Sequence, residues 1–255
     1  MSTSPAPLPP PPVPKRAVRV GDTREDLVKA IQARLDALGL GPIAVDGVFG
    51  AETASAVKLL QTRRGEIVDG IVGPATWAAL FGAPEPVPPP AGILGATLDV
   101  AGSQVGVVES GGPNRGPEVD RYLRSVGVDP TQGSFAWCAA FVHWCFGEAS
   151  TRLAVPNPCP PKAGCLALWG AAPAATRIAG DAAFDDSSLV HAGVVFVIDH
   201  GSGKGHVGFV AAIEAGRLAT IEGNTNPAGG RDGYGVFRRQ RAFSEINIGF
   251  LDFGR

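Results

Sequence analysis

The sequence predicts an α+β fold preceded by a small all-α domain, and three observations lead to this assignment. Two proline-rich segments divide the chain into a short unit and a long one. The long unit opens with apolar residues at helical spacing, from Leu94 to Val108. It closes with short strand-like runs separated by tight turns, at residues 194–198, 207–213, 218–222, 235–239 and 246–253. Helices followed by a series of short strands are typical of helices packed on an antiparallel sheet.

The domain boundaries follow from the prolines. Residues 5–14 and 84–90 contain twelve of the 23 prolines, and such segments favour extended polyproline II spacers. We therefore expect a proline-rich tail over residues 1–17, a small domain over 18–82, a proline-rich linker over 83–92 and a larger domain over 93–255.

Composition excludes several classes of protein. A chain of 255 residues that is 45% hydrophobic can bury a core, and a net charge of −2 argues against nucleic-acid binding. No apolar run is long enough for membrane insertion, and residues 1–14 lack the features of a Sec signal peptide. With no C-x-x-C or H-E-x-x-H we expect no metal and no cofactor, and we expect a monomer.

The small unit contains an internal repeat. Residues 45–53 (VDGVFGAET) return 23 residues later as residues 68–76 (VDGIVGPAT). In each copy Asp-Gly suits a turn that requires a positive φ. Gly50 and Gly73 suit the N-cap of a following helix, and Pro74 suits the first helical position. Each copy is therefore predicted to be a turn that leads into a helix.

A further helix is expected before the repeat. It begins at a capping-box variant, Thr23-x-x-Asp26, and ends at Gly39. With its apolar stripe and the doubled D-G-x-x-G-x-x-T, the unit resembles the bacterial peptidoglycan-binding domain of the three-helix type. That resemblance implies binding of bacterial peptidoglycan beside the D-G-x-x-G turns, with these candidate contacts: Asp46, Phe49, Gly50 and Thr53.

Cys138 is the sharpest chemical feature of the larger unit. A loop containing Gly and Ser leads into the apolar segment 135–146, and the cysteine lies where the helix should begin. Backbone N–H groups at a helix N-terminus favour the thiolate, which is the reactive form of cysteine. Cys145 lies two turns deeper and is interpreted as a packed core thiol.

Downstream residues supply the partners that a nucleophilic cysteine needs. Gly205-His206-Val207 places a histidine at the start of a strand, and Glu222-Gly223-Asn224 ends the next strand. A histidine can take the thiol proton and return it to the leaving amine, while an acid fixes the tautomer of the ring. We expect His206 to lower the pKa of Cys138 below its ordinary value of about 8.5.

These segments together resemble the CHAP family of papain-like peptidoglycan amidases and peptidases. The resemblance covers residues 93–255, apart from a poorly matching insertion at 149–190. It implies that Cys138 is the nucleophile, His206 the general base and acid, Glu222 the residue that orients His206, and Asn224 an accessory polar residue. The calcium-binding aspartate cluster of some members is absent, which again predicts no metal.

Other candidates in this domain stay open. His200 is a rival base, whereas His143 lies about 140° around the helix from Cys138. Gln132 could contribute to an oxyanion hole together with the N–H of Cys138. Cys159 and Cys165 could close a small disulfide in an oxidising compartment.

Strand parity adds a geometric prediction. His206 and Glu222 share a face of the sheet only if the hairpin that connects their strands has a three-residue loop, Glu214 to Gly216, or a bulge of equal effect. A regular two-residue turn at Ala215-Gly216 would pair Glu214 with Arg217 and turn Glu222 away from His206.

The two resemblances together predict a modular, endolysin-like peptidoglycan hydrolase that cleaves an amide bond of the peptide stem. Two alternatives stay open: a non-catalytic wall-binding or virion structural protein, and an NlpC-type cysteine endopeptidase with a second histidine in place of the acid. The sequence does not identify the amide. We expect action at the bacterial cell wall, after release by a holin, carriage by a virion or injection by a secretion machine.

Overall fold

The computed structural model describes residues 14, 16–82, 90–185, 189–214, 217–226 and 233–255. Most of the proline-rich tail and linker, and the loop residues Ala215 and Gly216, lie outside these ranges. The chain forms two compact units, residues 1–86 with 185–187, and the remainder of 87–255. Each unit is described by itself.

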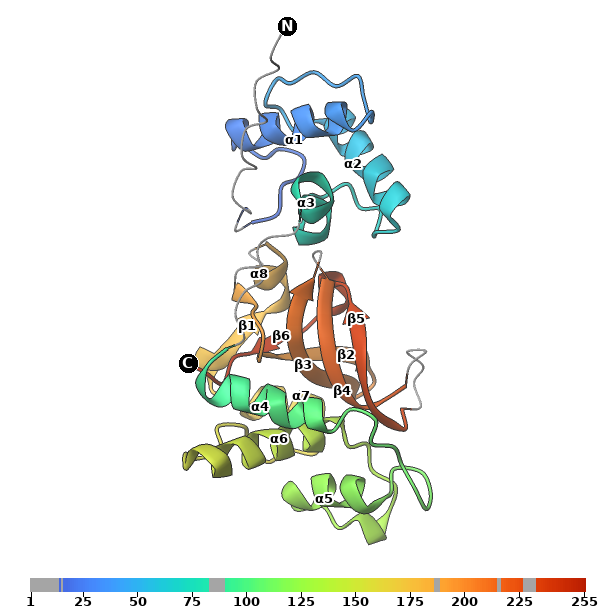
Figure 1. The fold of residues 1–255 in the computed structure, drawn as a ribbon, viewed down its shortest axis with the longest axis vertical. Coiled ribbons are helices and arrows are strands. Elements are labelled where there is room, and N and C mark those ends of the chain that lie inside the picture. The colour runs from blue at the N-terminus through green and yellow to red at the C-terminus, as the bar shows by residue number, and fades with distance from the viewer. Residues whose placement is uncertain (1–13, 15, 83–89, 186–188, 215–216, 227–232) are drawn as a thin grey trace, which may run out of the picture. The chain divides into compact units, whose positions relative to one another are not determined.

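The first unit contains three helices, α1 (Glu25–Ala37), α2 (Ala51–Arg64) and α3 (Pro74–Phe81) (Figure 1). Gly50 and Gly73 are the N-caps of α2 and α3, and Pro74 is the first residue of α3, as predicted. The predicted capping box of α1 is wrong. Arg24 is the N-cap of α1 and provides no side-chain cap, while Asp22 accepts its backbone N–H at 3.0 Å.

A buried glutamine holds each copy of the repeat. Gln32 donates to the side chain of Asp46 at 2.8 Å and accepts the N–H of Gly47 at 2.9 Å. Gln61 makes the same pair of bonds to Asp69 and Gly70, at 2.8 and 2.9 Å. Each glutamine also donates to the threonine that ends its motif, Thr53 or Thr76. The repeated motif is therefore a repeated hydrogen-bond network that fixes each turn.

The second unit opens with helices. The element α4 (Gly92–Ser103) is shorter than the predicted apolar stripe, which continued to Val108, and Val105 and Val108 are exposed beyond its end. The helix α5 (Pro117–Ser125) follows, and then a 3₁₀ turn (Pro130–Gln132) precedes α6 (Cys138–Leu153). The insertion contains α7 (Cys165–Ala171), β1 (Arg177–Ala179) and α8 (Gly180–Asp185).

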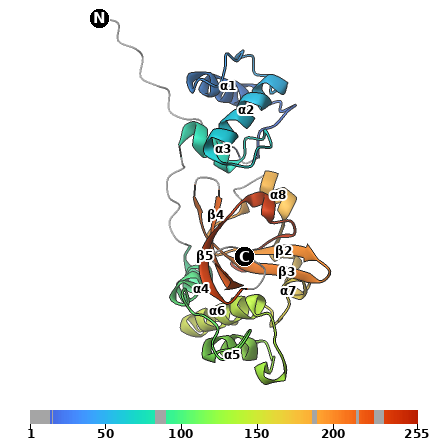
Figure 2. The same cartoon turned by 90° about the vertical axis from the view of Figure 1, so that its right-hand side faces the viewer.

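Among the described residues, six strands form one antiparallel sheet in the order β1-β6-β2-β3-β4-β5 (Figure 1). Figure 2 shows β2 to β5 above α5 and α6. An α+β fold is thereby confirmed. The strand from the insertion, β1, was not predicted, and it lies at one edge of the sheet beside β6. The other five occupy the predicted strand regions: β2 (Val195–Gly201), β3 (Lys204–Glu214), β4 (Arg217–Thr225), β5 (Gly235–Arg241) and β6 (Gly249–Leu251).

The two faces of the sheet contribute to different apolar clusters. Val207, Phe209 and Ile221 pack with residues of α4, α5, α6 and α7, and these helices lie together on one side of the sheet in Figure 1. Phe196 and Val210 belong to a second cluster with residues of α8 and the chain after β5. Because strand side chains alternate between faces, His206 and Gly208 project from the same face of β3 as Val210.

The hairpin of β3 and β4 corrects the predicted loop. Glu214 pairs with Arg217, so the three-residue loop is wrong, but a bulge between Val210 and Ala212 shifts the register by one residue. Phe209 therefore pairs with Ile221. Continued by one residue, this register places Glu222 opposite Gly208, on the face of His206. The alternative form of the prediction, a bulge of equal effect, is confirmed.

Candidate active site

Cys138 is the first residue of α6, as the sequence predicts, and its side chain is buried. The backbone N–H groups of Ala139 and Val207 both face its sulfur. Val207 follows His206 directly in β3, so the fold brings the thiol beside the strand that carries the predicted base. Hydrogen bonds from two backbone N–H groups favour the thiolate over the thiol.

His206 and Glu222 are in direct contact. Nε2 of the His206 ring lies 2.9 Å from Oε2 of Glu222, whose side chain is completely buried. Gly208 makes this possible, because a Cβ at that position would lie 2.9 Å from Cγ of Glu222. The glycine of the G-H-V-G segment thus leaves space for the carboxylate between β3 and β4.

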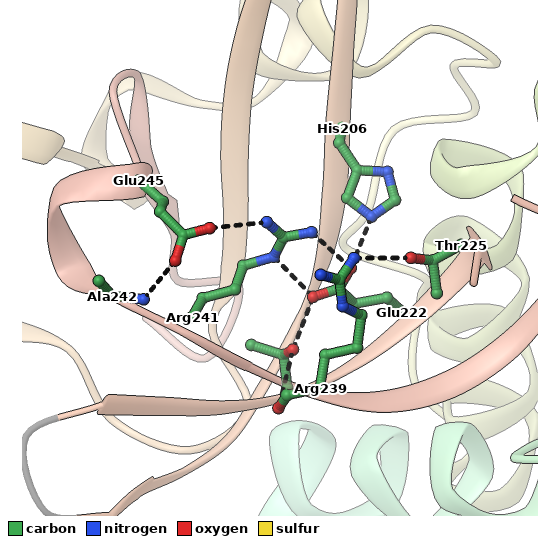
Figure 3. Close-up of polar contacts among 8 residues, drawn as sticks. His206, Glu222, Thr225, Arg239, Arg241, Ala242 and Glu245 are labelled. Carbon is green, nitrogen blue, oxygen red and sulfur yellow. Dashed lines mark hydrogen bonds and ion pairs between the residues drawn. The ribbon is translucent and has the colours of Figure 1, made fainter. Parts of the chain in front are cut away.

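Arg241 holds the other side of the carboxylate (Figure 3). Its Nε donates to Oε1 of Glu222 at 2.7 Å and its Nη2 donates to Oε2 at 2.8 Å. Thr220 donates to Oε1 at 2.6 Å, and Arg239 lies 3.9 Å from Oε2. A bidentate guanidinium fixes both the charge and the orientation of a carboxylate.

The pKa of Glu222 reflects these contacts. Burial raises it, but the hydrogen bonds from His206 and Arg241 outweigh burial and hold it well below its ordinary value. Glu222 is therefore an ionised acceptor, so Nε2 of His206 must carry the hydrogen that they share. Nδ1 is then the ring nitrogen with the free lone pair, and it makes no hydrogen bond to any described residue. That nitrogen is available to take a proton.

Asn224 is bonded to the backbone beside Cys138 and not to the ring of His206. With its amide oriented to satisfy both of its neighbours, it accepts the N–H of Trp137 at 3.2 Å and donates to the carbonyl of Gly233 at 2.9 Å. Its own backbone is left-handed, with a φ of 55°. Asn224 thus ties the end of β4 to the residue that precedes Cys138.

Cys138 has a second thiol as its neighbour. The side chain of Cys165 is hydrogen-bonded to that of Cys138. This bond lowers the pKa of Cys165 to about 7. The same bond, together with burial, raises the pKa of Cys138 well above its ordinary value. Our expectation of a lowered pKa at Cys138 is therefore wrong.

Among the described residues, no hydrogen bond connects the remaining candidates to Cys138, His206 or Glu222. Gln132 is exposed, and its amide donates to Asp129 and Thr131 within its own turn. His143 is half-buried, and its Nδ1 lies 2.8 Å from the carbonyl oxygen of Cys159. His200 is exposed at the end of β2. Of the candidate residues that the structure describes, only Glu222 is hydrogen-bonded to the ring of His206.

The proposed disulfide of Cys159 with Cys165 is not formed. All four cysteines of the chain are free thiols. The sulfur of Cys165 lies instead beside Cys138. Cys159 is buried, and its backbone carbonyl accepts from Nδ1 of His143 in α6.

The candidate wall contacts of the first unit differ in exposure. Asp46 is exposed and accepts the side chain of Gln32 and the N–H of Val48, which lower its pKa. Gly50 is half-buried at the N-cap of α2. Phe49 and Thr53 are buried at 1% and 2% exposure, which assigns them to the core and leaves little surface for a ligand.

Two findings concern the described part of the chain as a whole. No helix there is long and apolar enough to cross a membrane. No group of three or more His, Cys, Asp or Glu side chains within the same residues is arranged to hold a metal ion.

Sequence reasoning missed Arg241 and Cys165. Arg239 and Arg241 lie two residues apart on β5, and their partners on β4 are Thr220 and Leu218. Side chains directly opposite each other share a face, so both arginines project toward Glu222. The alternation was visible in the sequence, but its meaning required the register of β4 against β5.

Comparison with known proteins identifies the class of each unit. Residues 24–80 match the family described as "Putative peptidoglycan binding domain". Residues 130–224 match the family described as "CHAP domain", and this range runs from the 3₁₀ turn before Cys138 to Asn224. Both resemblances drawn from the sequence are confirmed by these matches.

Two curated proteins are similar to part of the chain. One is the "Uncharacterized protein in bpoA1 3'region" of Kitasatospora aureofaciens, 51% identical over 61 residues, which are 23% of this chain and 51% of that protein. Another is the N-acetylmuramoyl-L-alanine amidase CwlL of Bacillus licheniformis, 53% identical over 55 residues, which are 21% of this chain and 15% of that protein. The chain thus spans about half of the first and a small part of the second. No solved structure gives a significant match.

Proposed function

We propose that the chain is a peptidoglycan hydrolase that cleaves an amide bond of the peptide stem through Cys138, His206 and Glu222. The observation that carries the proposal is that β3 and β4 bring His206 and Glu222 together where β3 reaches Cys138, the first residue of α6. His206 is bonded to a buried, ionised Glu222, and the next residue, Val207, directs its N–H at the sulfur of Cys138. The CHAP match over the same residues supports the assignment.

The hydrogen bonds define a role for each nitrogen of the His206 ring. Nε2–H donates to Glu222, so Nδ1 is the base that removes the proton of Cys138 when substrate is bound. The imidazolium formed in this step is stabilised by the adjacent carboxylate. Because Arg241 also holds that carboxylate, we assign it as a positioning residue that acts through Glu222.

The covalent steps follow from this arrangement. The sulfur of Cys138 attacks the amide carbonyl, and the C–N bond breaks as His206 returns its proton to the leaving amine. The product is a thioester on Cys138. His206 then removes a proton from water as the water attacks the thioester. The C–S bond breaks, the sulfur of Cys138 takes the proton from His206, and a free carboxylate is released as the second product. The N–H of Cys138 is the donor we propose for the oxyanion, whereas the amide of Gln132, which the sequence suggested as a second donor, bonds within its own turn.

The first unit is proposed to bind the cell wall. Its match to the peptidoglycan-binding family carries this assignment, and the candidate contacts at its surface are the exposed Asp46 and the half-buried Gly50. We propose that the two domains extend over residues 18–82 and 93–255. A tether between a binding unit and a catalytic unit raises the effective concentration of substrate.

Digestion of purified sacculi tests the proposal. The intact chain should clear a turbid suspension, and mass spectrometry of the soluble products should show one class of stem amide opened. The same spectra identify the bond, whether between sugar and alanine or within or between stems. A chain that sediments with sacculi and releases no fragment would be a wall-binding protein without activity.

A further inference from the structure

Cys165, whose thiol lies beside the proposed nucleophile Cys138, has no role in the proposed hydrolysis. Cys165 is the first residue of α7, which belongs to the insertion that matches the CHAP pattern poorly. Cys165 is 7% exposed and Cys138 is 4% exposed. Both belong to the same apolar cluster between the helices and the sheet. Their thiols share a hydrogen bond.

The fold brings both sulfurs to one short stretch of β3. A Cβ on Gly205 would lie 2.8 Å from the sulfur of Cys165, so this sulfur packs directly on the glycine before His206. The sulfur of Cys138 faces the N–H of Val207, the residue after His206. The two sulfurs therefore flank the base on the strand, and the absence of a side chain at Gly205 makes room for the second one.

We propose that Cys138 and Cys165 are a modification site, at which a peroxide converts the two thiols into a reversible disulfide that removes the nucleophile. A disulfide needs its sulfurs about 2.05 Å apart. Since the thiols are already in contact, closure requires adjustment of the two side chains and not a rearrangement of the helices. Cys145 and Cys159, the other cysteines, are buried away from this contact and have raised pKa values.

The oxidation balances with hydrogen peroxide as the oxidant. The thiolate of the pair attacks one peroxide oxygen, the O–O bond breaks, and the sulfur becomes a sulfenic acid while hydroxide leaves. The second thiol then attacks that sulfur, the S–O bond breaks, and the departing oxygen takes up the thiol proton as water. The two sulfurs lose two electrons, and peroxide is reduced to one hydroxide and one water, the hydroxide taking a proton from solvent. An external thiol reverses the reaction.

The pairing of Cys138 with Cys165 makes this oxidation selective for these two cysteines. The thiolate needed for the first step exists near neutral pH, since the pKa of Cys165 is lowered to about 7, and the resolving thiol is its hydrogen-bond partner. A resolving thiol captures the sulfenic acid before further oxidation. The consequence for hydrolysis rests on the proposed function, whereas formation of the disulfide does not.

Disulfide mapping of the intact chain tests the inference without any substrate. The folded protein is exposed to hydrogen peroxide, blocked with iodoacetamide and digested with trypsin without reduction. Cleavage after arginine and lysine places Cys138 on residues 125–152, Cys159 on 153–162 and Cys165 on 163–177. We expect a peptide that joins 125–152 to 163–177, with fragmentation that assigns the bond to Cys138, and its loss after dithiothreitol.

Variants separate the proposed bond from other oxidations. Cys138→Ser should abolish the cross-linked peptide and leave Cys165 to proceed to the sulfinic acid, which dithiothreitol does not reverse. The matched control Cys159→Ser should retain the cross-link. A disulfide that involves Cys145 or Cys159 in the wild-type chain, or a Cys138 that is oxidised without a partner, would overturn the inference. A cross-linking chain that never hydrolyses sacculi would overturn the proposed function alone.

Discussion

Replacing Arg241 with methionine tests how the buried carboxylate of Glu222 is held. The side chain of Arg241 is 10% exposed and that of Glu222 is fully buried. Methionine keeps the unbranched stem, but it removes the two donors at 2.7 and 2.8 Å. Breaking one partner out of a buried ion pair costs about 3–5 kcal/mol. We expect the free energy of unfolding to fall by about that amount, which is a large share of the roughly 5–15 kcal/mol of a typical domain.

The same substitution should change how stability depends on pH. The pKa of Glu222 is lowered in the folded chain, because bonds from His206 and Arg241 outweigh the effect of burial. Such a group stabilises the fold above its unfolded pKa, and this contribution is lost as the pH falls through the folded pKa. Without Arg241 burial is opposed less, so the pKa of Glu222 rises and the acidic loss of stability should move to higher pH.

Denaturation by urea, followed by tryptophan fluorescence, provides the assay, because Trp137, Trp144 and Trp169 all lie in the second unit. Arg238→Met, at an exposed position of β5, is the matched control, and it should change stability by no more than about 0.5 kcal/mol. The double variant Arg241→Met/Glu222→Gln removes both charges and should recover most of the loss. A loss below about 1 kcal/mol for Arg241→Met would show that the ion pair contributes no more than a surface one.

Three further predictions concern the site and the repeat. Glu222→Gln should lower kcat/KM by about 10²- to 10⁴-fold, because the imidazolium loses its counter-charge. The control Glu245→Gln, at a residue that contacts Arg241 from its exposed side, should leave kcat/KM unchanged. Equal effects of the two variants would exclude a specific role for Glu222. Iodoacetamide should label the Cys138 and Cys165 pair before Cys145 and Cys159, with a midpoint near the pKa of about 7 at Cys165; uniform labelling by peptide mapping would contradict an activated pair. Gln61→Leu should cost about 1–3 kcal/mol by leaving the N–H of Gly70 and its neighbours unpaired, and an unchanged melting transition by calorimetry would refute the structural reading of the repeat.

Local patterns in the sequence were sufficient for most elements of the fold. The start of α6 at Cys138 and the N-caps at Gly50 and Gly73 depend on residues close together in the chain, and all three were predicted. The end of α4 was not predicted, because apolar residues continue at helical spacing as far as Val108 and do not mark where the helix stops. Strand β1 was missed because three residues of an insertion carry no alternating pattern.

The candidate site was predictable as a set of residues but not as a set of bonds. Strand parity required Glu222 and His206 to share a face, and it could not choose between a longer loop and a bulge. The neighbour of Cys138 was out of reach for a different reason. Cys165 is 27 residues away and reaches the site through a helix of the insertion, so only the packing of α7 on β3 could show that two thiols meet there.

The most direct test of the central claim is the composition of sacculus digests made by the wild-type chain and by Cys138→Ala. The account predicts that the wild type releases fragments with one stem amide opened and that the variant releases none. The variant should still sediment with the sacculi, because the nucleophile lies outside the peptidoglycan-binding unit. If Cys138→Ala released the same fragments at a comparable rate, the thiol of Cys138 would not be the nucleophile and the proposed mechanism would be wrong.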